Sequence, residues 1–109
     1  MNYAIIVEGK KDVGALKSLG FKKVYAIHET SVPIKERLLQ LSQQIDKKEK
    51  VCILTDFDKK GKQLYMLIKQ ILQELGVRTD STLRGLLLKA NVSHIEGLYS
   101  LFKHLEQFN

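Results

Sequence analysis

The fold of this chain is decided by the stretch "VCILTDFDKKGKQL", residues 51–64. Its first five residues are apolar or β-branched and predict a strand that is covered on both faces of a sheet. Asp56 and Asp58 follow this strand directly, and lysines around Gly61 then begin a pattern with helical spacing. A buried strand that leads at once into a helix favours an α/β fold.

The same pattern of a strand followed by a helix occurs twice before residue 51. Residues 3–7, "YAIIV", predict a first strand, which is followed by a helix with Asp12 as its N-cap and Gly20 just past its end. Residues 23–27 predict a second strand, and Pro33 marks the start of a second helix. Strands that alternate with helices predict an open, mostly parallel sheet.

The part of the chain after residue 58 is predicted to be mainly helical. Leucines and isoleucines at helical spacing predict a helix over residues 59–75, which Gly76 ends, and a short fourth strand is expected around Val77. The remainder, about residues 80–109, is expected to be helical and to pack on the rest, with a capping box in "SHIE", residues 93–96. We therefore expect one domain over residues 1–109, with a sheet of about four strands.

Composition excludes several classes of protein. The chain is 44% apolar and 28% charged, which is typical of a folded globular domain. It has no apolar run near the roughly 20 residues that cross a bilayer and no secretory signal pattern, so we expect a cytoplasmic protein without membrane partners. Cys52, the only cysteine, is expected to pack in the core. The net charge of +6 fits a nucleic-acid partner, but it also fits lysines on solvated helix faces.

Three acidic residues are expected at one edge of the sheet. Glu8 follows the first strand, whereas Asp56 and Asp58 follow the third, so pairing of these two strands would bring all three together. Clustered carboxylates repel one another unless a cation or a shared proton relieves them, and oxygen ligands of this kind suit Mg²⁺. If the chain stays extended, both aspartates face the cleft and Phe57 turns to the core; if a helix starts at Asp58, this residue caps it.

Two segments carry a family resemblance. The blocks "IIVEGKKD", residues 5–12, and "ILTDFDKKGK", residues 53–62, resemble the two signature motifs of the Toprim domain, which topoisomerases, bacterial-type primases and several nucleases share. The resemblance covers essentially the whole chain and implies a Rossmann-like three-layer sandwich. The later segment "VSHIEGL", residues 92–98, is similar to small archaeal Toprim proteins.

The resemblance also implies roles for individual residues. Glu8 matches the general acid or base of Toprim enzymes, and Asp56 and Asp58 match the aspartates that hold Mg²⁺, for which Mn²⁺ can substitute. All three are therefore predicted catalytic and metal-site residues. Gly9 would allow close backbone approach, and Gly61 would ease the loop into the next helix. The lysines expected beside the cleft, where they would neutralise a nucleic-acid backbone, are Lys10, Lys11, Lys59, Lys60 and Lys62.

Other residues depart from the family pattern or are expected to have no chemical role. Lys60 stands where some members carry a third aspartate, which puts a second metal in doubt. The tyrosines are expected to pack, and the histidines show no ligand spacing, so zinc is not indicated. These residues are Tyr3, Tyr25, Tyr65, Tyr99, His28, His94 and His104.

The sequence supports three hypotheses about function. The first is Mg²⁺-dependent phosphodiester chemistry on RNA or DNA, as a Toprim nuclease or processing factor. The second is a non-catalytic metal-binding module that binds nucleic acid or acts as an adaptor in a larger processing complex. The third is phosphoryl transfer through an acyl phosphate on Asp56.

Overall fold

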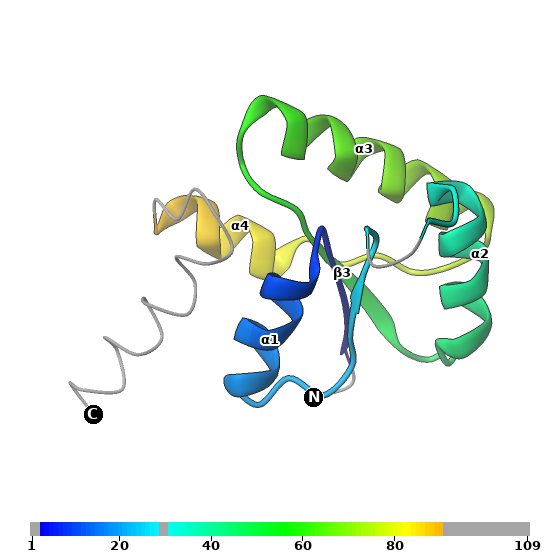
Figure 1. Cartoon of the computed structure of the whole chain (residues 1–109), viewed down its shortest axis with the longest axis horizontal. Coiled ribbons are helices and arrows are strands. Elements are labelled where there is room, and N and C mark those ends of the chain that lie inside the picture. Colours follow the sequence, from blue (N-terminus) through cyan, green and yellow to red (C-terminus); the bar gives the residue numbers. More distant parts are fainter. Residues whose placement is uncertain (1–2, 29–30, 91–109) are drawn as a thin grey trace.

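A computed structural model describes residues 3–28 and 31–90, in which strands and helices alternate along the chain (Figure 1). The strands are β1 (Tyr3–Val7), β2 (Val24–Ala26) and β3 (Lys50–Leu54). The helices are α1 (Lys10–Ser18), α2 (Ile34–Gln44), α3 (Lys59–Glu74) and α4 (Thr82–Lys89). The predicted α/β order is confirmed.

The sheet is parallel and has the strand order β2-β1-β3. β1 lies in the middle, and its five residues pair with β3 in a register from Tyr3 opposite Lys50 to Val7 opposite Leu54. The expected pairing of the first and third strands is therefore confirmed. Because both strands run in the same direction, the residues that follow them meet at one edge.

The prediction of a fourth strand around Val77 is wrong, because the described residues form a sheet of three strands. Beside β3 only an isolated bridge forms, between Val51 and Thr79, and the Asp80 N–H donates to the Val51 carbonyl at 2.9 Å. The Asp80 carboxylate then accepts a hydrogen bond from the Thr82 N–H at 2.8 Å, which turns the chain into α4. Pairing stops after one residue because the chain leaves the sheet edge there.

Alternate residues of the strands supply two separate cores, so the structure has three layers. Ala4, Ile6, Val51 and Ile53 pack against α2 and α3, whereas the alternating residues of the same strands pack against α1 and α4. Figure 1 shows these helix pairs on opposite sides of the sheet. Cys52 is buried in the second core, as expected.

Helix ends follow the sequence signals with one exception. Gly20 and Gly76 follow α1 and α3 with φ of +99° and +75°, a backbone conformation that favours glycine. The prediction that Asp12 is an N-cap is wrong, because α1 already begins at Lys10 with Gly9 as its N-cap. Asp12 lies in the first turn, where its carboxylate accepts a hydrogen bond from the Gly9 N–H at 3.3 Å.

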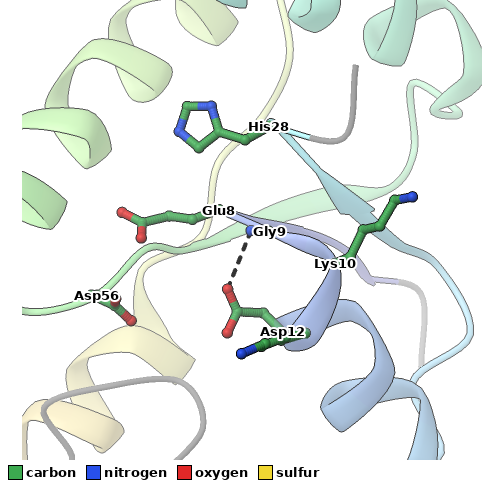
Figure 2. A pocket seen from close by; sticks show the side chains of 7 residues that line it. Glu8, Gly9, Lys10, Asp12, His28 and Asp56 are labelled. Carbon is green, nitrogen blue, oxygen red and sulfur yellow. Dashed lines mark hydrogen bonds between the residues drawn. The ribbon is translucent and has the colours of Figure 1, made fainter. Parts of the chain in front are cut away.

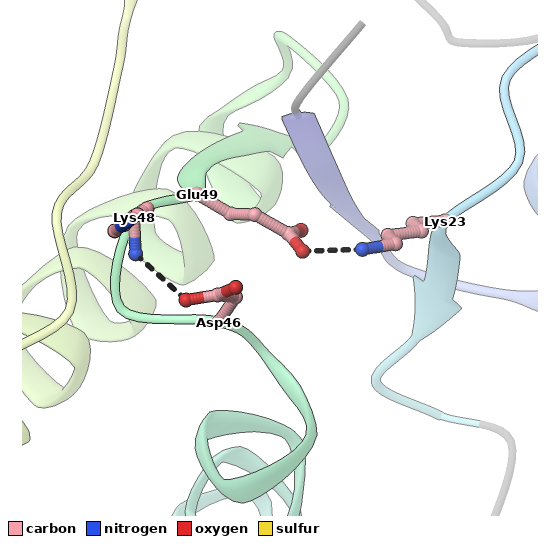
Figure 3. A network of polar contacts seen from close by, with 4 residues as sticks. All are labelled: Lys23, Asp46, Lys48 and Glu49. Carbon is pink, nitrogen blue, oxygen red and sulfur yellow. Dashed lines mark hydrogen bonds and ion pairs between the residues drawn. The ribbon is translucent and has the colours of Figure 1, made fainter.

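At the opposite edge of the sheet, an ion pair joins the segments that precede β2 and β3. The Lys23 ammonium donates to the Glu49 carboxylate, and Glu49 is only 9% exposed (Figure 3). The turn before β3 is held by Asp46, whose carboxylate accepts a hydrogen bond from the Lys48 N–H at 3.1 Å. The hydrogen bond to Glu49 raises the pKa of Lys23 above its ordinary value of 10.5.

Some predictions fall outside the described residues. These are the helical structure expected after residue 90 with its capping box at residues 93–96, and the roles expected for His94, Tyr99 and His104. Among the helices of the described part, none has the length and apolar character needed to cross a membrane.

The Lys23–Glu49 pair generates a stability prediction. Replacing Lys23 with methionine leaves a nearly buried carboxylate without its ammonium partner, so the free energy of unfolding at pH 7 should fall. The matched control is Lys22→Met at the exposed neighbouring position, which should have little effect. Urea unfolding monitored by circular dichroism measures both variants.

The pH dependence of this difference has a fixed sign. A raised lysine pKa stabilises the folded state below pH 10.5, and this stabilisation is lost as the pH rises through the raised value. The difference in the free energy of unfolding between wild type and Lys23→Met should therefore become smaller as the pH rises through the raised pKa of Lys23. If Lys22→Met and Lys23→Met lowered the free energy of unfolding equally, this result would contradict a specific interaction between Lys23 and Glu49.

Candidate functional site

The carboxyl ends of β1 and β3 place Glu8 and Asp56 beside one cavity. This cavity has a volume of about 410 Å³ and is lined by Glu8, Gly9, Lys10, Lys11, Asp12, His28 and Asp56 (Figure 2). Glu8 immediately follows β1, and Asp56 is the second residue after β3. Two residues 48 positions apart in sequence therefore meet because their strands are paired in parallel.

The acidic residues act on one another electrostatically. The pKa of Glu8 is raised above its ordinary value of 4.5, first by partial burial and then by the negative charges of Asp56, Asp58 and Asp12. A hydrogen bond with the Asp56 side chain raises it further. Such a cluster is relieved by a proton shared between carboxylates or by a cation.

Asp58 takes the capping role that the sequence left open. It is the N-cap of α3, and its Oδ1 accepts a hydrogen bond from the Gly61 N–H at 2.7 Å. Phe57 packs against the core beneath α1 and α4, although the sequence predicted this for a chain that stays extended through Asp58. The Asp58 charge still contributes to the raised pKa of Glu8, so Asp58 belongs to the same electrostatic cluster.

Gly61 allows α3 to pack directly on the end of β3. A Cβ atom at this position would overlap the carbonyl oxygen of Asp56 and lie 2.6 Å from its carbonyl carbon. The Thr55 hydroxyl donates to the Gly61 carbonyl at 2.7 Å, and this hydrogen bond also holds the first turn of α3 against the end of β3. Gly61 thus does more than ease a loop: its missing side chain sets the position of the Asp56 backbone. At Gly9, by contrast, a Cβ would meet open space.

Sequence reasoning missed Arg84, which lies behind Asp56. Its guanidinium donates to the carbonyl of Thr55 at 2.6 Å and to the carbonyl of Asp56 at 3.2 Å. It is only 6% exposed although it is charged. The available signal was its position beside Leu83 and three residues before Leu87, on the face of α4 that the leucine spacing predicts to be buried.

The predicted lysines divide into two groups. Lys10 and Lys11 begin α1 and line the cavity, although Lys10 extends away from Glu8 in Figure 2. The other three, Lys59, Lys60 and Lys62, are exposed in the first turn of α3 and do not line the cavity. His28, for which the sequence predicts no chemical role, is exposed and contributes to the cavity wall.

The chemistry of the donor set fits a hard divalent cation. Carboxylate oxygens on Glu8 and Asp56 are ligands of the kind that Mg²⁺ takes, usually one or two from the protein with water and phosphate completing the shell. Within residues 3–28 and 31–90, no three acidic, histidine or cysteine side chains form a group that could hold a metal ion. The three-ligand set of Glu8, Asp56 and Asp58 therefore stays a prediction.

Comparison with known families and proteins gives consistent results. A family model of the Toprim domain matches residues 3–94. A UPF0292 protein of Pyrococcus horikoshii is 34% identical over 102 residues, covering 91% of this chain and 74% of that protein. A UPF0292 protein of Thermococcus onnurineus is 37% identical over 102 residues, covering 91% and 73%.

Two solved structures have a similar fold. A putative protein from Aquifex aeolicus superposes with a TM-score of 0.75 and 30% identity, covering 88% of this chain and 84% of the other. The zinc-binding and RNA polymerase domains of the Aquifex aeolicus primase give a TM-score of 0.59 and 31% identity. In that case 72% of this chain is covered but only 18% of the primase chain.

The packing of Gly61 predicts a position-specific effect of alanine. Gly61→Ala should lower the free energy of unfolding by about 1–3 kcal/mol, because the new methyl group forces α3 away from the Asp56 backbone. Gly14→Ala in α1 is the matched control: its Cβ meets open space, so helix propensity should stabilise it by about 0.5–1 kcal/mol. Chemical denaturation distinguishes the two, and a stable Gly61→Ala variant would refute the close approach.

The raised pKa of Glu8 predicts a stability difference that depends on pH. The folded state binds this proton more tightly than the unfolded state, so its stability falls as the pH rises from 4.5 through the raised pKa. Without added metal, Glu8→Gln should therefore be more stable than wild type at pH 8, and the difference should vanish below pH 4.5. Thermal unfolding across this range measures it.

A glutamate outside the acidic cluster provides the control for the pH-dependent stability of Glu8→Gln. Glu74→Gln removes an exposed carboxylate at the last residue of α3 and should leave the pH profile unchanged. A Glu8→Gln variant that is less stable than wild type at pH 8 would show that repulsion among the acids is not significant.

Proposed function

This chain belongs to the Toprim family, as its two sequence blocks predicted, and on that premise we propose that it performs Mg²⁺-dependent chemistry on nucleic-acid phosphodiesters. The proposed role is that of a nuclease or a processing factor for RNA or DNA. The observation that supports it is the meeting of Glu8 and Asp56 at one cavity, at the edge where β1 and β3 end.

Glu8 is proposed to move the proton of the reaction. Its pKa is raised above the ordinary value of 4.5 by burial and by the neighbouring acids, so it keeps a proton at a higher pH than an ordinary glutamate. It would act at the attacking or leaving oxygen of the phosphodiester. Asp56 and Asp58 are proposed to hold the cation with Glu8. A bound Mg²⁺ would stabilise negative charge on the phosphate.

The lysines are proposed to bind the nucleic-acid backbone. Lys10 and Lys11 line the cavity, and Lys59, Lys60 and Lys62 present exposed ammonium groups in the first turn of α3. Phosphate contacts of this kind give an affinity that falls steeply with salt. We also propose that residues 1–109 act as one Toprim domain and that the protein acts in the cytoplasm.

One observation favours a second candidate function. Asp58 caps α3, so one oxygen of its carboxylate already accepts a hydrogen bond from the Gly61 N–H. A site with this limited donor set would suit a module that binds nucleic acid through a metal without cleaving it, as an adaptor in a larger processing complex. Binding without turnover on every substrate would support this alternative.

The proposed activity is tested by cleavage of labelled single- and double-stranded RNA and DNA with and without Mg²⁺. Glu8→Gln and Asp56→Asn should each reduce the cleavage rate by about 10²-fold or more, as expected when a general acid or base or a metal ligand is lost. Mn²⁺ should replace Mg²⁺. Gel analysis of initial rates at fixed ionic strength measures the effect.

Asp58→Asn separates the two roles of that residue. Asparagine is as good an N-cap as aspartate, so the variant should fold normally while losing the negative charge. A loss of Mg²⁺-dependent cleavage in this variant supports a ligand role. Glu74→Gln is the control for a distant carboxylate. Wild type that binds neither Mg²⁺ nor Mn²⁺, with nucleic-acid affinity unchanged in Glu8→Gln and Asp56→Asn, would refute the proposed function.

A further inference from the structure

We propose that Arg84 is the positioning residue of the acidic site, a buried cation on α4 that holds the backbone at Asp56 so that its carboxylate stays beside Glu8. This inference rests on the proposed function for its metal-binding test, but its structural part is independent of metal. Arg84 lies on a helix that contributes no residue to the cavity lining.

The guanidinium makes contacts on several sides. It donates to the carbonyls of two consecutive residues, Thr55 at 2.6 Å and Asp56 at 3.2 Å. Its central carbon also lies 4.5 Å from the ring centroid of Phe57 and 4.4 Å from that of Tyr65. A planar group held by two hydrogen bonds and two aromatic faces has little freedom to rotate.

These contacts converge on the segment that carries the acids. Thr55 is fully buried, and its hydroxyl binds the Gly61 carbonyl while its own carbonyl binds Arg84. Thr55 and Arg84 thus connect the end of β3 with the start of α3 and with α4. The direction of the Asp56 side chain follows from this fixed backbone.

Burial of an arginine is costly unless its charge is compensated. Burial lowers the pKa of Arg84, whereas Tyr65 and Cys52, followed by Glu8 and Asp56, act in the opposite direction. The carbonyls of Thr55 and Asp56 supply hydrogen-bond acceptors that a buried guanidinium needs.

The positioning role and a purely electrostatic role predict opposite effects on metal affinity. Removing a positive charge next to a cation site, by itself, strengthens cation binding, because like charges repel. Removing a group that orients the ligands weakens it, typically by 10–100-fold for partners directly behind metal ligands. The sign of the change therefore identifies the role.

The first experiment measures Mg²⁺ and Mn²⁺ affinity by isothermal titration calorimetry, at a temperature where circular dichroism shows each variant to be folded. Arg84→Met should weaken binding by at least about tenfold. Arg84→Lys keeps the charge but lacks the planar two-pronged donor, so its affinity should lie between those of Arg84→Met and wild type. Arg78→Met removes an exposed arginine that precedes the Val51–Thr79 bridge and should not weaken binding.

Two outcomes of the titration would overturn the inference. Unchanged or tighter binding in Arg84→Met would mean that the guanidinium does not orient the ligands. Affinity equal to that of wild type in Arg84→Lys would mean that the two-carbonyl contact is not needed. A variant that only unfolds more easily, but binds normally when folded, gives the first of these results.

The second experiment needs no metal. The amides of Gly61 and Lys62 donate to Asp58 at 2.7 Å and 2.9 Å, so their hydrogen exchange reports the order of the loop behind the acids. In Arg84→Met these two amides should exchange at least about tenfold faster, while the Asp80 amide, bonded to β3 at 2.9 Å, should not change. Equal exchange in wild type and variant would overturn the inference.

The two experiments also separate this inference from the proposed function. Wild type that binds neither ion would refute the metal-dependent function, and hydrogen exchange would still decide whether Arg84 holds the loop. Wild type that binds Mg²⁺, with no effect of Arg84→Met on affinity or exchange, would leave the function intact and remove Arg84 from it.

Discussion

The parallel pairing of β1 with β3 is the constraint on which the rest of the structure depends. It makes β1 the central strand, buried on both faces, and it brings the residues that follow two distant segments to one sheet edge. A shift of register by one residue would turn Val51 and Ile53 from one core to the other, so the apolar side chains fix the register strongly. Carboxylates that repel one another are thus held together by hydrophobic packing in the strands behind them.

The segment from Thr55 to Gly61 converts this pairing into a defined site. Its backbone is fixed by the Thr55 hydroxyl, by the absence of a side chain at Gly61 and by the Arg84 guanidinium. Asp58 has two roles, because it caps α3 and adds negative charge to the cluster around Glu8. The positions of Asp56 and Asp58 therefore depend on backbone contacts as well as on the pairing of the strands.

Much of this could be predicted from the sequence, because the signals are local. Apolar runs located the strands, and Gly20, Pro33 and Gly76 marked helix boundaries, where a fixed φ or a missing side chain decides the conformation. The adjacency of Glu8 and Asp56 followed from fold class, since parallel strands end at the same edge. The fourth strand was wrong because propensity around Val77 says nothing about how soon Asp80 turns the chain away. Arg84 was missed because its partners are carbonyls 28 and 29 residues earlier, which no local pattern encodes.

The two edges of the sheet differ in the charged groups that surround their partly or nearly buried glutamates, and this difference bears on the proposed function. At the amino-terminal edge the nearly buried Glu49 is paired with the Lys23 ammonium. At the carboxyl-terminal edge the burial of Glu8 is accompanied by three further carboxylates that raise its pKa, although the exposed Lys10 and Lys11 follow it by two and three residues. A phosphate that approached this cavity would be attracted by the lysines and repelled by the acids. A divalent cation held by the carboxylates would offset that repulsion, so the same arrangement that opposes a bare polyanion would favour one that arrives with its metal.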